Sequence, residues 1–292
     1  LGRQSLKGVA GYDLTSLLVG SEGTLALIAG ITVHLIPAPE AVETAWLTFP
    51  DMAKANDTAA RMFAAGIVPS TLEVMDRLAL DVVRPAAPFR IPVGAGAAIL
   101  AETDGPASQA REALLRLAEI AVEAGATDTA VASSDKQREA MRRTRRLVSS
   151  TLKEKMPHKI SDDIAVPRSR MAEALERAQA LGDEMGIEVS AYGHLGDGNL
   201  HVNLLCRSAE EQAQGEVLRR RITAVIVGMG GTITGEHGIG LAKRDLLPIE
   251  QAPSVIALQQ RLKSVFDPQG ILNPGKVFSS LAPPFATQGA HA

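Results

Sequence analysis

Two kinds of hydrophobic pattern alternate along most of the chain. In one, short apolar runs are bounded by turn residues, which is typical of strands; in the other, apolar residues recur at helical spacing. The pattern predicts strands at residues 45–49, 70–74, 97–102, 128–132 and 160–166, and a pair of strands within 187–205. It predicts helices at residues 51–65, 108–124, 135–153, 169–185, 210–229 and 253–266. Alternation of strands and helices indicates an α+β or α/β body.

The first 40 residues have a different pattern. We expect them to be extended, with a glycine-rich turn at 20–24 and an apolar stretch at 25–36 that ends at Pro37 and Pro39. Such a segment cannot bury both of its faces alone, so we expect it to need a partner sheet. At the other end, residues 280–292 are small and proline-containing, which predicts disorder.

Composition narrows the class of protein. The 292 residues are 46% hydrophobic and 22% charged, with a formal net charge of −3 and 3% aromatic residues. This balance does not favour a nucleic-acid partner. A single cysteine, Cys206, excludes an internal disulfide framework and indicates a reducing, cytoplasmic setting. The longest apolar run, at 91–101, is too short for a membrane span, although peripheral association with a membrane stays open. The chain opens at Leu1 without a methionine, so we expect it to begin inside a longer protein.

The segment 192–203 carries the strongest chemical signal. Asp197-Gly198 lies between two apolar runs and predicts a two-residue hairpin turn. In that register residue 196 faces 199, residue 195 faces 200, and His194 faces His201 directly. Two imidazoles on one side of a hairpin, about 4.5–5.5 Å apart at Cβ, can bind one metal ion. The alternative is two histidines that only pack beside a turn.

A second glycine-rich segment, 230–240, offers further ligands. Its polar side chains Glu236 and His237 are adjacent, and neighbours on an extended chain point to opposite sides. One of them can therefore bind a metal while the other faces a reacting atom. Two imidazoles and one carboxylate leave coordination positions open, as a catalytic site requires. The alternative is a flexible surface loop.

A basic helix and a short loop give weaker signals. Arg138, Arg142, Arg145 and Ser149 recur every three or four residues, so they share one face of the helix predicted at 135–153. That face is either solvated or an anion site. Lys159 and Asp163 follow on the next extended segment, close enough in sequence to fold back on the helix. The loop at 20–24 either cradles a phosphate or makes a plain turn, and its spacing is neither that of a P-loop nor that of a dinucleotide fingerprint.

Taken together, four stretches resemble the FAD-linked oxidase family, within the vanillyl-alcohol oxidase and p-cresol methylhydroxylase superfamily. Its members include D-lactate dehydrogenases, D-2-hydroxyglutarate dehydrogenases and the flavin subunit of glycolate oxidase. The matching stretches are Gly-Tyr-Asp-Leu at 11–14 with Gly-Ser-Glu-Gly-Thr-Leu at 20–25, Gly-His-Leu-Gly-Asp-Gly-Asn-Leu-His at 193–201, Gly-Glu-His-Gly-Ile-Gly at 235–240 with Lys243, and Phe-Asp-Pro at 266–268 with Leu-Asn-Pro-Gly-Lys at 272–276.

The resemblance implies a metal-assisted flavoenzyme that oxidises a D-2-hydroxy acid of the lactate, glycolate or 2-hydroxyglutarate type to the 2-oxo acid. In metal-dependent members, the residues that match His194, His201 and Glu236 bind a divalent ion, usually Zn²⁺, with Mn²⁺ or Fe²⁺ as alternatives. The residue that matches His237 is the general base.

The resemblance also implies how the substrate and FAD are held. Arg145, with Ser149 one turn later, matches the clamp for the substrate carboxylate, and Lys159 matches a further clamp residue. Family members have an aromatic residue three positions before that arginine, where this chain has Arg142. The residues expected to contact FAD are Gly20, Ser21, Gly23, Thr24, Asn273 and Lys276.

The implied fold is α+β, with ferredoxin-like antiparallel sheets and packed helices. Residues 1–40 match only the end of the FAD-binding domain, residues 41–268 match the substrate or cap domain with the metal site, and residues 269–292 match a segment that returns to the FAD domain. The chain then looks like part of a longer flavoenzyme with an unknown electron acceptor. Two other functions remain as alternatives: a metal-dependent hydrolase, and a fragment that binds metal and acid without catalysis. Assembly as a homodimer also stays open.

Overall fold

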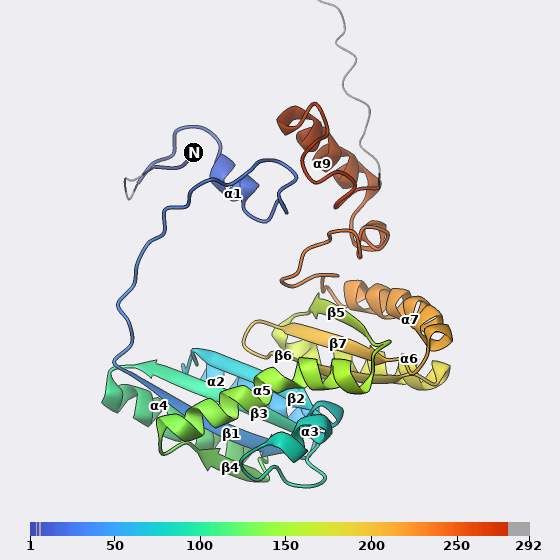
Figure 1. Cartoon of the computed structure of the whole chain (residues 1–292). Coiled ribbons are helices and arrows are strands. Elements are labelled where there is room, and N and C mark those ends of the chain that lie inside the picture. Colours follow the sequence, from blue (N-terminus) through green and yellow to red (C-terminus); the bar gives the residue numbers. More distant parts are fainter. Residues whose placement is uncertain (4, 6, 280–292) are drawn as a thin grey trace, which may run out of the picture. The chain divides into compact units, whose positions relative to one another are not determined.

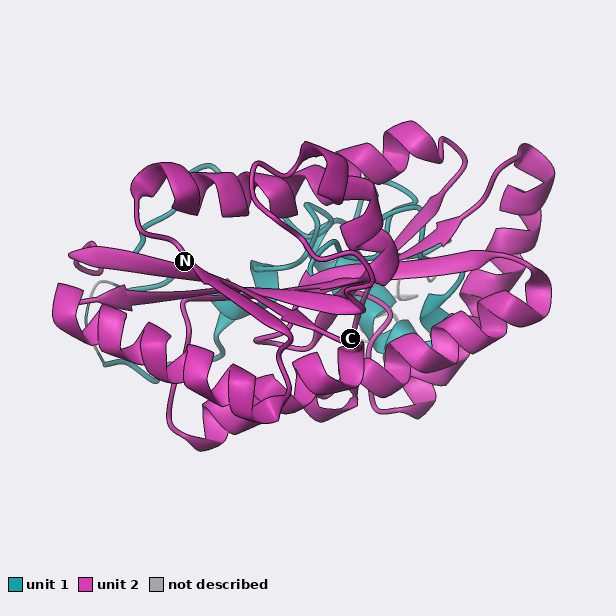
Figure 2. Cartoon of the chain, turned by 90° about the horizontal axis from the view of Figure 1, so that it is seen from below, with its two compact units in different colours: residues 1–35, 236–292 teal, residues 36–235 magenta. Residues whose placement is uncertain are grey.

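The computed structural model describes residues 1–3, 5 and 7–279. The disorder predicted for residues 280–292 lies outside the described residues. The chain divides into two compact units, one of residues 36–235 and one of residues 1–35 with 236–292 (Figures 1 and 2). Each unit is described by itself. In the described part of the chain, no helix combines the length and hydrophobicity that crossing a membrane requires.

The larger unit is built on one seven-stranded antiparallel sheet, with the strand order β4-β1-β3-β2-β6-β7-β5 (Figure 1). The strands are β1 (Ala41–Phe49), β2 (Thr71–Asp76), β3 (Ala97–Gly105), β4 (Asp128–Val131), β5 (Ile160–Ala165), β6 (Glu188–His194) and β7 (Asn199–Leu205). The helices are α2 (Met52–Ala64), α3 (Arg77–Val83), α4 (Ala107–Ala124), α5 (Asp135–Lys155), α6 (Met171–Met185) and α7 (Ala209–Gly228), with short 3₁₀ turns at Arg84–Ala86 and Arg168–Arg170.

The sheet consists of two halves built on the same βαββα order. The first half runs β1-α2-β2-α3-β3-α4-β4, which is a ferredoxin-like unit with α3 added between β2 and β3. The second half runs β5-α6-β6-β7-α7, and in place of a fourth strand it has a single bridge between Ala165 and Thr232. The halves join where β2 pairs with β6. This arrangement confirms the predicted α+β class with an antiparallel, ferredoxin-like sheet.

One face of the sheet is apolar along its whole width. The large core formed there contains Leu47 and Ile99 of the first half and Ile164 and Leu200 of the second, all buried. Helices α2, α4, α6 and α7 pack on this face through apolar residues at helical spacing. Figure 2 shows helices on both sides of the sheet, which is seen edge-on.

The other face changes character from one half to the next. Over the first half, Trp46, Met75 and Leu100 form a second apolar core with α3 and α5. Over β6, β7 and β5 the same face presents polar side chains, because the alternating residues there are Ser190, Tyr192 and His194 on β6, Asn199, His201 and Asn203 on β7, and Ser161 and Asp163 on β5. The candidate chemistry therefore lies on one face of one half.

Most of the predicted elements are present, and their ends move by a few residues. The helix α3 was not predicted. Asp76 starts it, because its carboxylate accepts a hydrogen bond from the backbone N–H of Ala79 at 2.8 Å.

The prediction that residues 1–40 are wholly extended is wrong. Asp13 caps a short helix, α1 (Leu14–Leu18), through the backbone N–H of Ser16. Residues 25–36 form no strand, and Leu27, Ile31 and Leu35 are exposed. Strand pairing needs a neighbouring strand, and the described part of the chain supplies none to this segment.

The smaller unit contains α1 together with α8 (Leu247–Glu250) and α9 (Pro253–Phe266). Buried Lys263 on α9 donates to the backbone carbonyls of Thr24 and Leu272, both at 2.7 Å, and contacts the carboxylate of Asp267. The charge of this buried lysine is thus compensated by a carboxylate and two carbonyls. Through these bonds Lys263 links the loop at Thr24 to the segment at Leu272.

Candidate functional site

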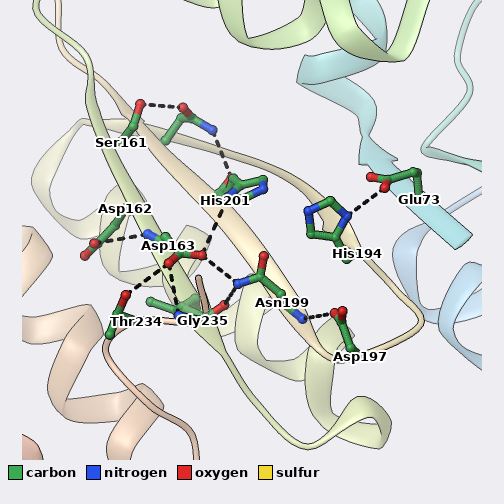
Figure 3. A network of polar contacts seen from close by, with 12 residues as sticks. Glu73, Ser161, Asp162, Asp163, His194, Asp197, Asn199, His201, Thr234 and Gly235 are labelled. Carbon is green, nitrogen blue, oxygen red and sulfur yellow. Dashed lines mark hydrogen bonds and ion pairs between the residues drawn. The ribbon is translucent and has the colours of Figure 1, made fainter. Parts of the chain in front are cut away.

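His194 and His201 lie on the polar face of the β6–β7 hairpin with their rings together (Figure 3). Their ring centroids are 5.2 Å apart and the rings are nearly perpendicular, at 87°. Both side chains are partly buried, with exposures of 30% and 14%. Each imidazole has two nitrogens, so two rings at this separation can each direct one nitrogen to the same ion.

The predicted register of the hairpin is wrong by two residues. His194 pairs with Asn199, and His201 pairs with Tyr192, so the histidines are diagonal rather than directly opposed. The turn contains four residues, 195–198, instead of the predicted two. A shift of two keeps every side chain on its face, because the side-chain period of a strand is two. The histidines therefore stay together despite the error.

Tertiary contacts determine this longer turn. The side chain of Leu195 is buried in the core, and its N–H donates to the carbonyl of Leu72 at 2.8 Å. Gly198 has a φ of +88°, and a Cβ there would lie 2.1 Å from the carbonyl oxygen of Val166. Only glycine fits this position. Asp197 and Gly198 therefore belong to a four-residue turn that packs against Val166 and Leu72, and they do not form a two-residue hairpin turn.

Glu73 on β2 contacts the first histidine. Its Oε1 lies 2.6 Å from Nδ1 of His194 (Figure 3). Its Oε2 accepts from Nε of Arg145 at 2.9 Å. The carboxylate is buried, which by itself raises its pKa. The hydrogen bond with His194 and the positive charge of Arg145 outweigh burial, so the pKa of Glu73 falls below its usual value.

Asp163 on β5 lies beside the second histidine. It is fully buried and pairs in register with His201, whose Nδ1 is 3.7 Å from its Oδ1. Its carboxylate accepts from Nδ2 of Asn199 at 2.6 Å, from Oγ1 of Thr234 at 3.1 Å and from the N–H of Gly235 at 3.0 Å (Figure 3). Three donors compensate the buried charge and fix the end of the larger unit to β5.

Glu236 and His237 follow Gly235 directly and begin the second part of the smaller unit. Gly235 is closely packed, since a Cβ there would lie 2.0 Å from Nδ2 of Asn199. The covalent chain therefore leaves the larger unit beside Asp163. That Glu236 binds a metal and that His237 acts as a base both stay predictions.

Lys159 belongs to a polar cluster on the same face as the histidines. Its Nζ donates to Oδ1 of Asn203 at 2.9 Å, and it also contacts Ser161. Nδ2 of Asn203 donates to the backbone carbonyl of His201 at 2.9 Å. Burial, together with the nearby charge of Lys153, lowers the pKa of Lys159. Asn203 thus links this lysine to the second histidine.

The basic face of α5 is in large part paired. Arg142 donates to Glu102 at 2.7 Å, and Arg145 binds Glu73, so both arginines hold the helix to carboxylates of the sheet. Ser149, the other predicted substrate residue on this helix, is exposed. Arg145 uses Nε and Nη2 toward Glu73, which leaves further N–H groups of its guanidinium for another acceptor.

The predicted FAD-contacting residues come together within the smaller unit. Nδ2 of Asn273 donates to the backbone carbonyl of Glu22, in the loop that also holds Gly20, Ser21, Gly23 and Thr24. The backbone N–H of Lys276 donates to the carbonyl of Asn273 at 3.2 Å. Glu22 itself accepts from the N–H groups of Ile239 and Gly240, both at 2.7 Å. Three of the four motif stretches therefore meet in one unit.

Comparison with known proteins establishes the family. Residues 38–277 match the model of the FAD linked oxidases, C-terminal domain. The chain is 35% identical over 280 residues to the glycolate oxidase subunit GlcD of Bacillus subtilis, covering 95% of this chain and 60% of the relative. It is 34% identical over 281 residues to a D-lactate dehydrogenase of Archaeoglobus fulgidus, covering 96% of this chain and 61% of the relative. The chain therefore belongs to the FAD-linked oxidase family and spans about 60% of the length of these relatives.

Solved structures support the fold. p-Cresol methylhydroxylase superposes with a TM-score of 0.65 at 14% identity, over 83% of this chain and 53% of that chain. An alkyldihydroxyacetonephosphate synthase superposes with a TM-score of 0.63 at 17% identity, over 91% of this chain and 50% of that chain. The resemblance to this family, and to its glycolate and D-lactate members, is confirmed.

Residue-by-residue reading of the sequence missed two acidic side chains of the site. Glu73 was not singled out, because it lies 121 residues before His194 in an ordinary strand. Asp163 was noted only for its place near the basic helix, and its contacts with Asn199 and Gly235 depend on sheet pairing. A glutamate between the apolar residues Leu72 and Val74 was a local signal for Glu73.

Proposed function

We propose that the complete protein oxidises a D-2-hydroxy acid to the 2-oxo acid, with FAD as the hydride acceptor and a divalent ion at His194, His201 and Glu236. Membership of the FAD-linked oxidases and relatives named glycolate oxidase and D-lactate dehydrogenase support the reaction class. The observation that carries the proposal is the histidine pair on one face of the sheet, with a carboxylate beside each ring.

The donor set fits a metal ion. Histidines that bind metals usually have a second partner at the other ring nitrogen, commonly a carboxylate, and Glu73 and Asp163 occupy such places. Two imidazoles and one carboxylate suit Zn²⁺, and they also accept Mn²⁺ or Fe²⁺. A bound divalent ion would lower the pKa of the substrate hydroxyl, and bound FAD would supply the acceptor for the hydride.

The protein's own residues hold the substrate and move the proton. Arg145, with Ser149 and Lys159 nearby in sequence, binds the carboxylate of the hydroxy acid and so fixes which face of the carbon is presented. The imidazole of His237 takes the proton from the hydroxyl oxygen as the carbonyl forms. In this reaction the alcohol loses one proton to His237 and one hydride to the acceptor, which leaves the 2-oxo acid.

We infer that the smaller unit contributes part of a flavin site. Gly20 has a φ of +81°, and a Cβ there would meet nothing within 4 Å, so its backbone borders open space. Gly23 packs against Asn273, since a Cβ there would lie 2.7 Å from its Nδ2. We propose that Gly20, Ser21, Gly23 and Thr24, with Asn273 and Lys276, border the flavin. We therefore expect this chain to purify colourless or to bind FAD weakly.

Metal and flavin analysis tests the proposal on this chain and on the full-length gene product. We expect about one divalent ion in the wild type and loss of most of it in His201→Ala. His34→Ala is the matched control, because His34 is an exposed histidine far along the chain from the hairpin. An unchanged metal content in His201→Ala would contradict the proposed metal site. In the full-length product, we expect bound yellow flavin and dye reduction that depends on a 2-hydroxy acid; a colourless product with hydrolase activity would contradict the proposed reaction.

A further inference from the structure

Glu73 contacts both the predicted metal ligand His194 and the predicted substrate clamp Arg145. It lies on β2 directly opposite His194 on β6, so both side chains leave the same face of the sheet. The histidine contacts one oxygen, Oε1, at 2.6 Å, and Arg145 contacts the other, Oε2, through Nε at 2.9 Å and Nη2 at 2.7 Å. Each oxygen thus has its own partner.

The surroundings hold this carboxylate in one place. The side chains of Glu73 and Arg145 are 15% and 12% exposed. The guanidinium carbon of Arg145 lies 4.7 Å from the centre of the Tyr192 ring, which adds a cation–π contact. Strand pairing fixes the backbone of Glu73, and the helix α5 fixes that of Arg145. A buried carboxylate with two charged or polar partners has little freedom to reorient.

We propose, on the basis of the proposed function, that Glu73 is a positioning residue that prepares His194 to bind metal through Nε2. A neutral imidazole carries its proton on one nitrogen and an acceptor lone pair on the other. The Glu73 carboxylate accepts from Nδ1–H, so the lone pair of His194 is left on Nε2. The same carboxylate holds Arg145, and it therefore couples the position of the substrate clamp to that of the metal ligand.

The substitution Glu73→Gln tests these two contacts separately from the size of the side chain. Glutamine has one acceptor oxygen, whereas the carboxylate accepts on both sides. In Glu73→Gln the amide can accept from His194 or from Arg145, but its NH₂ group then faces the remaining donor. The variant keeps the size of the side chain and removes one of the two interactions.

The chain offers a matched control in Glu102. This buried glutamate on β3 accepts from Nε of Arg142 at 2.7 Å and from Oγ1 of Thr44 at 2.7 Å. Arg142 precedes Arg145 by three residues on α5, so Glu102→Gln breaks the same kind of arginine pair on the same helix. In the described part of the chain Glu102 bonds to Thr44, Thr71 and Arg142, so its loss should affect stability and leave metal affinity unchanged.

The first test is zinc affinity of the full 292-residue chain, measured by competition with a chromophoric chelator. We expect Glu73→Gln to bind zinc roughly 10–100-fold more weakly, as is usual when the second partner of a metal-binding histidine is lost. Glu102→Gln should stay within about twofold of the wild type, because it touches neither ring. Equal affinities of Glu73→Gln and the wild type would overturn the proposal while leaving the metal site intact.

The second test needs no zinc, and it uses a variant only to assign the His194 signals. In the metal-free wild type, ¹⁵N correlation spectra of the histidine rings, at a pH where His194 is neutral, should show the Nδ1–H tautomer for that residue. Signals missing in His194→Asn assign the ring. A wild-type His194 in the Nε2–H tautomer would overturn the role of Glu73. Failure of the wild type to bind any zinc would instead contradict the proposed function, so the two failures are distinguishable.

Discussion

The two halves of the seven-stranded sheet are built on the same βαββα order and differ at their last step. In the first half, β4 pairs with β1 from Thr48–Asp128 to Ala45–Val131, and the chain then leaves for α5. In the second half, among the residues that the structure describes, the corresponding place beside β5 holds an isolated bridge between Ala165 and Thr232. Two residues further along this incomplete ladder, main-chain pairing would bring Asp163 opposite Thr234.

Instead of that main-chain pair, the Asp163 side chain accepts from the hydroxyl of Thr234 and the N–H of Gly235. The unfinished strand therefore brings a buried carboxylate and the start of the Glu236-His237 segment to the row that contains His201. The same face of the βαββα scaffold is therefore an apolar core in the first half and carries the candidate histidines in the second half. The difference arises where one strand is replaced by a glycine-rich turn.

The largest expected effect tests the segment that replaces the strand. In the full-length protein, His237→Ala should lower kcat for a D-2-hydroxy acid by roughly 10²–10⁴, which is the usual contribution of a positioned acid–base group. Metal content should survive, because the proposed ligands are His194, His201 and Glu236 rather than His237. Steady-state kinetics with metal analysis measure both quantities.

Arg145→Ala is the contrast to this variant. We expect it to act mainly through KM, with a rise of roughly 10–100-fold, because hydrogen bonds to a charged group contribute about 1.5–3 kcal/mol in ground state and transition state alike. Loss of metal in His237→Ala would identify His237 as a ligand instead of the base. Near-normal kcat in His237→Ala would show that His237 takes no part in the reaction.

A pair of core substitutions tests whether the apolar face is equivalent in the two halves. Leu47 on β1 and Ile164 on β5 lie on the first strands of the two halves and are both buried in the large core. Leu47→Ala and Ile164→Ala should each lower the free energy of unfolding by about 2–5 kcal/mol, the usual cost of such truncations. Urea denaturation measures this. A much smaller loss for Ile164→Ala would show that the second half contributes little to the common core.

A smaller effect concerns the junction of the halves at Asp76. Its carboxylate accepts from Oγ of Ser190 at 2.9 Å and from the N–H of Ala191 at 2.8 Å, so it extends the β2–β6 contact. Burial raises the pKa of Asp76 from its ordinary value of 3.8 to about 6, although its hydrogen bonds act in the opposite direction.

Because the pKa is higher in the folded state, that state binds the proton more tightly than the unfolded chain does. The stabilising contribution is complete below about pH 4 and is lost as the pH rises through 6, by up to about 3 kcal/mol. Asp76→Asn lacks this titration. The difference in unfolding free energy between wild type and variant should therefore change between pH 4 and pH 7, as measured by urea denaturation. A constant difference would show that Asp76 titrates normally in the fold.

Local patterns in the sequence determined most of the secondary structure and the identity of the histidine pair. Helical spacing located α2, α4, α6 and α7, and Asp-Gly beside two histidines identified a hairpin whose face survived a register error of two residues. The period of two along a strand explains that survival. The four motif stretches taken together also indicated the family, because each is contiguous in the sequence and can be recognised without the fold.

Only the tertiary structure decided the turn length, the carboxylates beside the histidines and the partner of Arg145. Leu195 is drawn into the core and lengthens the turn, while β2–β6 pairing brings Glu73 to a histidine 121 residues away. Asp163 meets Gly235 across 72 residues because one strand is left unfinished. Such contacts depend on which strands become neighbours, and that is set by the burial of whole faces of the sheet rather than by any local pattern.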